Sequence, residues 1–446
     1  MKRAKIIFFI LAFLVFLTSM ALANGLNLNS IGSKALAMGG AFVGLADDFS
    51  AIYWNPAGIA QFNKQYFGFY GVDILPSGTY KLSPDIPGIG EIPLVNAKTE
   101  RKHYLAGMVA YYYPVSKNMV AGLGIYTPSG LGANWDSADF AVLANNNPAV
   151  EWTSKIGVVT FAPAIAYKVN DQLSVGAALN INYGMFDVAM YAGATEPPLP
   201  VVDLAQYEET MNGWGYGATF GVLYKATDKI SVGATFRTAS TVKFSGEATI
   251  SNLPLLGGNS TSDLDREVTW PMWIAGGVAY RPLDKLVLTA DLQWTQWSKI
   301  DVIETTYKDP FWALMMGQSG DDKRPMQWKD RLQVRFGAEY WINNIAFRAG
   351  YYYDPSPAPD ETMNVLLPNY YFHALAAGVG YNLNGLQIEF SVEYLMGKER
   401  NVNYAVTPLP VPPYFEIVMP LGYETAMPGK YSQNILAPNI SVSYKF

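Results

Sequence analysis

The chain has 446 residues, a formal net charge of −6, no cysteine, and only 15% charged residues beside 14% aromatic ones. An average soluble domain carries roughly 25% charged residues, so this composition argues against an ordinary soluble protein and favours a surface that faces lipid. The absence of cysteine excludes disulfides and cysteine metal sites, and the acidic balance argues against a nucleic-acid partner.

Residues 1–23 are predicted to be a secretory signal peptide. Three basic residues precede an apolar run over residues 6–17, which is too short to span a bilayer. Residues 21–23, Ala-Leu-Ala, fit the small-x-small cleavage pattern. The alternative is an uncleaved anchor helix. Cleavage would remove the three basic residues and leave 28 Lys and Arg against 37 Asp and Glu, which is a net charge of −9.

Residues 24–63, here called the hatch segment, show no strand-like alternation and are rich in Gly and Ala. They carry large apolar side chains, among them Phe42, Phe49 and Trp54. A disordered periplasmic tail, which is the alternative, would not need such residues. Because the segment precedes the first predicted strand of a wide barrel, we expect it to lie inside the lumen as a plug.

The rest of the chain, residues 64–446, is predicted to form fourteen antiparallel strands. Their ranges are 65–75, 101–114, 118–129, 155–169, 171–190, 211–226, 229–250, 264–281, 285–306, 328–342, 344–354, 370–382, 385–399 and 433–446. In 386–394 an apolar residue alternates with a polar one throughout, and the last strand ends on Phe446. A strand whose apolar face meets lipid requires a closed barrel, because lipid tolerates no open sheet edge.

The connections alternate between tight turns and long loops, which is typical of an outer-membrane barrel with periplasmic turns and extracellular loops. Seven long connections are predicted, at 76–100, 130–154, 191–210, 251–263, 307–327, 355–369 and 400–432. The even strand count places both ends of the barrel on the periplasmic side. A soluble sandwich or propeller is the alternative, but the strands do not repeat as blades.

The loop after residue 307 contains a predicted helix start, because Asp309 is a good N-cap and Pro310 suits the first helical position. Its apolar residues are candidates for ligand binding, with methionines suited to an adaptable site. They are Phe311, Trp312, Leu314, Met315 and Met316. The alternative is that the loops pack on one another as a lid.

Strand parity places several charged residues on the polar, lumen-facing side. The basic ones are Arg237, Lys243, Arg331, Arg335 and Arg348, and the acidic ones are Asp291, Glu339, Glu389 and Glu393. Most are expected to form structural ion pairs. Arg237 and Lys243 are the best candidates to hold a ligand carboxylate, because no acid shares the polar face of their strand before Glu247.

No catalytic residue, metal site or cofactor is predicted. The only two histidines, His103 and His373, lie near the ends of strands, and a hydrolase would need a Ser or Asp beside one of them. The glycines of the strands alternate with apolar residues and indicate close packing inside the lumen.

Several motifs make the chain similar to the FadL family of outer-membrane transporters for hydrophobic compounds, which includes the TodX-type channels. The most specific is Asn55-Pro56-Ala57-Gly58, which matches the family's hatch signature. The resemblance implies that loops capture a hydrophobic substrate, that the hatch shifts, and that the substrate leaves sideways near a kink in the third strand. Weaker matches are residues 39–41, 46–48, 126–135, 328–330 and 348–354.

The implied lateral opening would lie at Pro128, Gly130 and Gly132. Proline removes a ladder donor and glycine weakens a strand, so a break there is chemically plausible. The alternative is that the third strand simply ends there and enters its loop.

One segment departs from the family pattern. Many members carry an acid and an Arg after the Pro that opens the twelfth strand, whereas residues 368–372 here read Pro-Asn-Tyr-Tyr-Phe. This loss favours neutral hydrophobic ligands slightly.

The function predicted from the sequence is passive uptake of hydrophobic molecules, such as long-chain fatty acids, alkanes or aromatics, across the outer membrane of a Gram-negative bacterium. The partners are these molecules and outer-membrane lipid, and a monomer is expected. The alternative is a surface receptor or adhesin on a barrel scaffold. That function would not need the hatch segment, and a polar porin would bring more charge to its pore.

Overall fold

The computed structural model describes residues 25–29, 31–195, 197, 200–408, 415–423 and 425–446. The predicted signal peptide lies outside the described residues. In the described part of the chain, no helix is long and apolar enough to cross a membrane.

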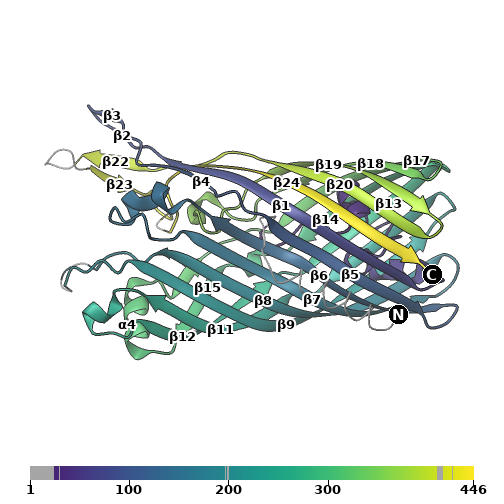
Figure 1. The fold of residues 1–446 in the computed structure, drawn as a ribbon, viewed down its shortest axis with the longest axis horizontal. Helices are drawn as coiled ribbons and strands as arrows, with labels where there is room; N and C mark the ends of the chain where they lie inside the picture. Colours follow the sequence, from purple (N-terminus) through teal and green to yellow (C-terminus); the bar gives the residue numbers. More distant parts are fainter. Residues whose placement is uncertain (1–24, 30, 196, 198–199, 409–414, 424) are drawn as a thin grey trace.

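The strands close into one antiparallel barrel, as predicted (Figure 1). It has fourteen wall strands, here called staves, because several of them consist of two elements in series. In chain order the staves are β1 (Tyr66–Leu82), β5 (Tyr104–Pro114), β6 (Met119–Asn134), β7 (Thr153–Lys168), β8 (Leu173–Tyr191), β9 (Gln206–Lys225), β10 (Ile230–Arg237) with β11 (Ser240–Ile250), β12 (Thr261–Trp270) with β13 (Trp273–Leu283), β14 (Leu286–Thr295) with β15 (Val302–Tyr307), β16 (Lys323–Pro325) with β17 (Arg331–Ile342), β18 (Ile345–Asp354), β19 (Phe372–Leu383), β20 (Leu386–Gly397) with β21 (Arg400–Val402), and β24 (Gly429–Lys445). The first and last staves pair from Tyr66↔Lys445 upward, which removes the sheet edge.

Shorter elements decorate the barrel at its loop end and inside it. The strands are β2 (Asp85–Ile86), β3 (Gly90–Glu91), β4 (Val95–Lys98), β22 (Ala405–Pro408) and β23 (Phe415–Val418). The helices are α2 (Ser33–Ala37), α3 (Ala51–Trp54), η1 (Pro56–Gln61), η2 (Ser137–Leu143), η3 (Leu253–Leu256), η4 (Trp297–Lys299), α4 (Pro310–Ser319) and η5 (Asp360–Thr362).

The alternation along the strands separates a lipid face from a lumen face. In β20, Ile388 and Phe390 are exposed, whereas Glu389 and Ser391 are buried. An exposed apolar face is the arrangement that lipid favours, and the buried polar face is the arrangement that lumen packing requires. In strands without an interruption, such as β20, the period-2 pattern therefore predicted both the strand and its inner and outer sides.

The third strand was predicted to end at residue 129, but β6 continues to Asn134. The segment with Pro128, Gly130 and Gly132 lies within the strand, so the alternative that the strand ends there is wrong. A register shift between Tyr126 and Ser129 in the pairing with β7 marks a bulge at the proline.

Interruptions between β10 and β11 and between β12 and β13 change which residues face inward. Odd-numbered residues are buried in β10, and even-numbered residues are buried in β11. The pairing with β9 shifts by one residue across the break, from Arg237↔Thr219 to Val242↔Gly215. A one-residue slip moves every later side chain to the other face.

Candidate functional site

The described part of the hatch segment lies inside the barrel. Nearly all of its residues from 25 to 59 are buried, among them Phe42, Phe49, Ile52 and Trp54. The segment folds as short helices joined by turns, because glycines at 32, 39 and 40 take positive φ angles that end or begin each turn. Its aromatic side chains fill the lumen that a barrel of this width would otherwise leave open.

Asn55 fixes the hatch segment to the wall. Its Nδ2 donates to Val43 O at 2.9 Å and to Val222 O on β9 at 3.0 Å, and its Oδ1 accepts from Ala57 N at 3.1 Å. The last bond caps η1, with Pro56 at the first position of the helix.

Glycines on three neighbouring strands make room for the Asn-Pro-Ala-Gly turn. A Cβ at Gly221 would lie 2.1 Å from Asn55 Oδ1, and one at Gly176 would lie 2.4 Å from Pro56 O. Gly233 lies as close to Val43 O, at 2.0 Å from an added Cβ. Gly58 in turn abuts Ala46 within the hatch segment. The wall and the turn are therefore shaped for each other.

A buried ionic network joins the other side of the hatch segment to the wall. Lys34 Nζ lies 2.9 Å from Asp47 Oδ1 and 3.4 Å from Glu339 Oε2. Glu339 pairs with Arg348 Nε at 2.7 Å, and Arg348 Nη2 pairs with Glu389 at 2.9 Å. Arg348, Glu339 and Glu389 thus form structural ion pairs, as expected from the sequence.

Asp48 gives this attachment a pH dependence. Burial, together with the nearby carboxylate of Glu389, raises the pKa of Asp48 to about 7, against the opposing effect of the hydrogen bonds from Ser50. Asp47 and Lys34 also face it with weaker effects. Between roughly pH 4 and pH 7 a released Asp48 loses its proton while the buried one keeps it. Rising pH therefore favours release of the hatch segment.

We expect the thermal unfolding midpoint in detergent to be lower at pH 8 than at pH 5, because the Asp48 contribution to the free energy of unfolding falls by roughly 2–3 kcal/mol between these two pH values. Asp48→Asn should weaken this dependence, since the amide does not titrate. Unfolding curves of both proteins at the two pH values test this, and an equal pH dependence in the variant would contradict it.

The first described residues of the hatch segment close the wall beside the bulge in β6. Strand β5 pairs with β6 only as far as Met108↔Tyr126. Above that point Leu28 N donates to Pro128 O at 3.0 Å and Gly130 N donates to Leu26 O at 3.0 Å. Residues 26–28 therefore act as a short extra strand on the edge of β6, with Asn27 opposite Ser129.

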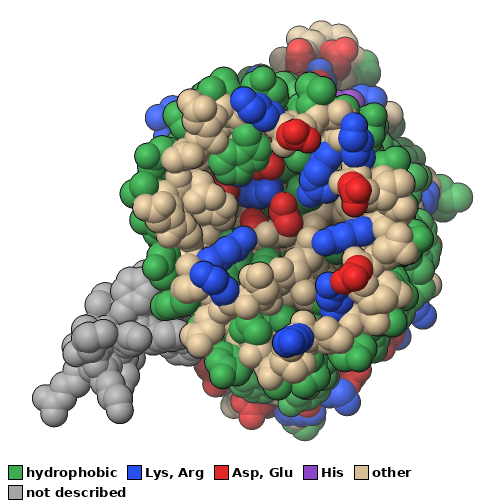
Figure 2. Space-filling model, turned by 90° about the vertical axis from the view of Figure 1, so that its right-hand side faces the viewer, with side chains coloured by type: hydrophobic (Ala, Val, Ile, Leu, Met, Phe, Trp, Pro, Cys, Tyr) green, Lys and Arg blue, Asp and Glu red, His purple; other side chains and the backbone are tan. Residues whose placement is uncertain are grey.

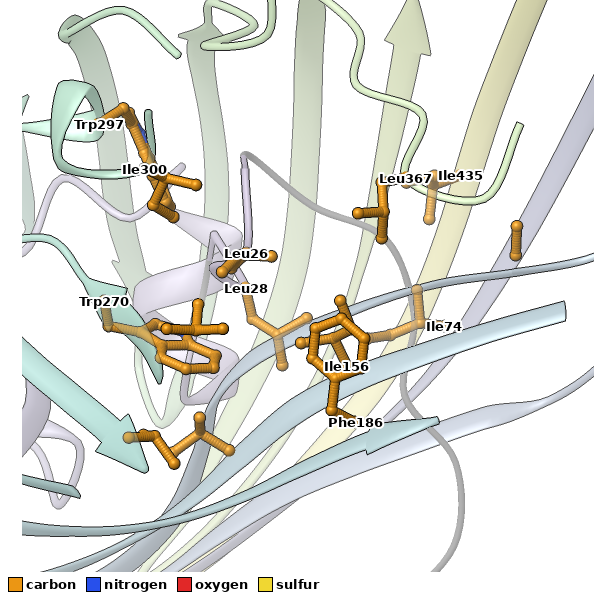
Figure 3. Packing of buried hydrophobic residues seen from close by; sticks show 14 of the residues in the cluster. Leu26, Leu28, Ile74, Ile156, Phe186, Trp270, Trp297, Ile300, Leu367 and Ile435 are labelled. Carbon is orange, nitrogen blue, oxygen red and sulfur yellow. The ribbon is translucent and has the colours of Figure 1, made fainter. Parts of the chain in front are cut away.

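Trp270 adds two linked hydrogen bonds at the same place, here called the latch. Its Nε1 donates to Ser129 Oγ at 2.7 Å, and the Ser129 hydroxyl donates to Leu26 O. Figure 3 shows Leu26 and Leu28 among side chains from β7, β8 and β12, namely Ile156, Phe186 and Trp270. The latch joins the hatch segment, the bulged strand and a distant stave.

Trp270→Phe keeps an aromatic ring at this position and removes the hydrogen bond. We expect the amide of Leu28 to exchange about fivefold faster, since a hydrogen bond contributes on the order of 1 kcal/mol. Hydrogen exchange of the peptide that contains residues 26–28 measures this. An unchanged rate would show that the latch holds nothing.

A cavity of about 40 Å³ lies next to the latch. Asn27, Pro128, Arg237 and Trp270 are among its lining residues. Its volume suits a water-sized group rather than a lipid tail, so passage at this point requires the hatch segment to move.

Arg237 faces the lumen, as expected from parity. Its Nε donates to Thr219 Oγ1 at 3.1 Å and its Nη2 to Tyr53 O at 3.2 Å, and the guanidinium lies over the Tyr53 ring. Within the part of the chain that the structure describes, no carboxylate lies within 4.0 Å of it. Arg237 thus brings an uncompensated positive charge to the cavity.

The expectation that Lys243 faces the lumen is wrong. Its side chain is 76% exposed and pairs with Glu267 at 3.2 Å on the outer face of β11. The cause is the break at residues 238–239, where Thr238 Oγ1 accepts from Ala218 N and replaces a backbone partner. The slip reverses the faces of the strand after Arg237.

Sequence reasoning missed a further luminal cation, Arg324 on β16. It pairs in register with Ile303, which is buried on the lumen side, and its Nη2 lies 3.8 Å from Met190 Sδ. The neighbouring Arg266 is compensated, because it binds Glu209 through two bonds of 2.6 and 2.8 Å. No carboxylate of the described residues lies within 4.0 Å of Arg324. Only the short Lys-Arg-Pro sequence could have pointed to it.

The predicted loop helix is present as α4. Asp309 accepts from Phe311 N at 2.8 Å and Trp312 N at 3.1 Å, and the helix ends at Gly320 in the left-handed region. Trp312 and Met316 are buried, whereas Leu314 is 60% exposed. Phe311 and Met315 are half-buried, so the helix presents an apolar strip toward the outside.

The chain was compared with known proteins and structures. The family described as "Outer membrane protein transport protein (OMPP1/FadL/TodX)" matches residues 14–416. A long-chain fatty acid transport protein of Salmonella typhi is 23% identical over 421 residues, covering 87% of this chain and 91% of that protein. The fold is shared with a Pseudomonas aeruginosa FadL homologue, at a TM-score of 0.72 and 17% identity over 95% of this chain and 100% of that one.

The Pseudomonas putida toluene transporter TodX has the same fold, with a TM-score of 0.70 and 16% identity over 95% of this chain and 100% of that chain. A match of the family over most of the sequence, together with a closed fourteen-stranded barrel, establishes the relationship. The chain belongs to the OMPP1/FadL/TodX family of outer-membrane transport proteins and is an outer-membrane protein of a Gram-negative bacterium.

Proposed function

We propose that this chain is a passive channel that takes hydrophobic molecules from outside the cell and releases them sideways into the outer membrane. The observation that carries the proposal is the bonding of residues 26–28 to the free edge of β6. A segment that completes the wall through two backbone hydrogen bonds can open it by leaving. Sideways release suits an apolar molecule, which gains free energy by entering lipid rather than water. The proposed function is transport without a catalytic step, and the proposed oligomeric state is a monomer.

Capture is assigned to the loop end, where α4 offers Phe311, Leu314 and Met315. Trp312 and Met316 hold the helix in place, since Trp312 Nε1 donates to Asn259 O at 2.8 Å. An apolar strip on a helix that is anchored from below can take a lipid tail without unfolding.

Two cations are assigned to a ligand carboxylate, Arg324 near the loop end and Arg237 beside the cavity. Each has guanidinium donors to spare for charge-assisted hydrogen bonds. These two arginines favour a fatty acid over a neutral hydrocarbon, whereas the sequence of residues 368–372 slightly favoured neutral ligands. An arginine does contact that segment, since Asn369 O accepts from Arg400 at 2.7 Å.

The gate is assigned to the hatch turn Asn55, Pro56, Ala57 and Gly58. The exit is assigned to Pro128, Gly130 and Gly132, where β6 bulges. Gly132 lies so close to β7 that an added Cβ would be 2.4 Å from Ser154 O. The relatives named as a long-chain fatty acid transport protein and a toluene transporter support both candidate ligand classes.

Uptake of radiolabelled oleate and of toluene tests the proposal, in cells that lack their own fatty acid transporter and express this protein. We expect oleate uptake to rise at least severalfold over cells with an empty vector. Rapid toluene uptake without oleate uptake would limit the ligands to neutral hydrocarbons. Absence of both, with folded protein in the outer membrane, would overturn the proposal and favour a surface receptor.

A further inference from the structure

The periplasmic turns of the barrel are strongly basic. Five exposed or half-exposed turns and ends hold eight basic residues and three acidic ones, whereas the whole chain has a formal charge of −6. The basic residues are Lys64, Lys117, Lys168, Lys225, Lys229, Arg281, Lys285 and Lys445, and the acidic ones are Asp171, Asp228 and Asp284. Figure 2, which views this end of the molecule, shows Lys and Arg side chains around the rim. The surplus of positive charge is therefore local to one end.

Within the part of the chain that the structure describes, most of these basic side chains form no ion pair. Lys168 pairs with Asp171 at 2.7 Å, and Lys445 lies over the Tyr66 ring at 5.0 Å. Among the described residues, no carboxylate lies within 4.0 Å of Lys117, Lys225 or Lys285. Charges that are not paired within the protein are free to bind an outside anion.

An outward-facing tyrosine comes directly before the basic residue in four staves. The pairs are Tyr167-Lys168, Tyr224-Lys225, Tyr280-Arg281 and Tyr444-Lys445. These four tyrosines are between 41% and 47% exposed, on the lipid side of the wall. Outward tyrosines at a barrel rim lie at the level of the lipid headgroups. The adjacent basic residues start from the opposite face at the strand end and lie at the same depth.

The basic residues are confined to one arc of the rim. They belong to the turns that follow β5, β7, β9 and β13 and to the junction of β1 with β24. The turns 342–345 and 383–386, which follow β17 and β19, have no charged residue. A general need for solubility would charge all turns alike, whereas a preferred lipid on one side accounts for the arc.

We propose that this arc, here called the basic rim, binds the headgroups of anionic phospholipids in the periplasmic leaflet. The tyrosines position the barrel at the interface, and Lys117, Lys225 and Lys285, which have no carboxylate partner among the described residues, contact the phosphates. Because attraction between an exposed lysine and an anionic surface is screened by salt, binding should weaken as ionic strength rises. The proposal is independent of the transported ligand.

Native mass spectrometry of the full-length mature protein in detergent tests the proposal, with an equal mixture of dioleoyl phosphatidylglycerol and dioleoyl phosphatidylcholine. We expect the protein to retain phosphatidylglycerol at least about tenfold over phosphatidylcholine. The triple variant Lys117→Gln, Lys225→Gln and Lys285→Gln should lower that ratio by about tenfold or more, since each lysine near an anionic surface contributes about fivefold.

The matched control is the triple variant Lys102→Gln, Lys308→Gln and Lys323→Gln at the loop end. Each of these lysines pairs with a carboxylate, on Glu100, Asp265 and Glu304. The control should leave the lipid ratio unchanged, and the gel mobility of the unheated barrel should show that both triples fold. No preference in the native protein, or an equal ratio in both triples, would overturn the proposal. The proposal would also be overturned if the native protein bound an acidic soluble protein while the basic-rim triple variant kept the native lipid ratio.

Discussion

Replacing Asn55 by alanine is expected to release the hatch segment while the barrel stays folded. The substitution removes three hydrogen bonds, to Val43 O, to Val222 O and from Ala57 N. At about 0.5–1.5 kcal/mol each, their loss destabilises the attachment by roughly 2–4 kcal/mol. Amides of residues 42–58 should then exchange at least about 30-fold faster, and the protein should conduct ions in a planar bilayer, where the native protein stays closed.

Asn364→Ala is the matched control for this experiment. Asn364 also makes three side-chain bonds, accepting from Leu366 N and Leu367 N and donating to Thr362 O, but within a loop. It should leave both hatch exchange and conductance unchanged. Native exchange rates and a closed channel in Asn55→Ala would show that this residue does not hold the gate.

Replacing Arg324 by alanine is expected to reduce oleate affinity by about 10- to 100-fold. A hydrogen bond to a charged group contributes roughly 1.5–3 kcal/mol. Among the described residues, the one hydrogen-bond partner of Arg324 Nη2 is the Met190 thioether. Toluene has no carboxylate, so its binding should change less than about twofold. Equilibrium binding of both ligands to purified protein measures the difference.

Arg324→Lys keeps the charge and should retain most of the oleate affinity, whereas Lys308→Ala, an exposed residue paired with Asp265, should have no effect. Arg237→Ala distinguishes the two cations, because a site beside the cavity affects release more than capture. Equal oleate affinity in the native protein and in both arginine variants would mean that the carboxylate is not recognised and that the ligand is a neutral hydrocarbon.

The barrel was predictable from the sequence because each strand has one face in lipid, and that requirement produces a period of two. The hatch signature was also visible, but not its partners. Gly221 and Gly233 lie far from Asn55 in the sequence, and nothing local in the sequence brings them to it. Contacts of this kind depend on the barrel closing first.

Three features escaped prediction for identifiable physical reasons. The upper part of β6 contains Pro128, Gly130 and Gly132, which weaken a strand, so a strand end was as reasonable as a bulge. Lys243 was placed on the wrong face because Thr238 hides a slip in register. Arg324 lies in a strand of three residues, which is too short to produce a pattern.

A disulfide between the hatch segment and β6 tests the central claim, that the first residues of the hatch segment must leave the wall for transport. Asn27 and Ser129 face each other as a non-hydrogen-bonded antiparallel pair, because the bonds run from Leu28 N to Pro128 O and from Gly130 N to Leu26 O. Such pairs bring the two Cα atoms to about 4.5 Å, within the range of a disulfide. The native chain has no cysteine, so Asn27→Cys with Ser129→Cys creates a single pair.

The measurement is oleate uptake by cells that express the double variant, before and after reduction. The account predicts that uptake is lost while the disulfide is closed and returns when it is reduced, with each single variant active throughout. Full uptake with the disulfide closed would contradict lateral release beside β6.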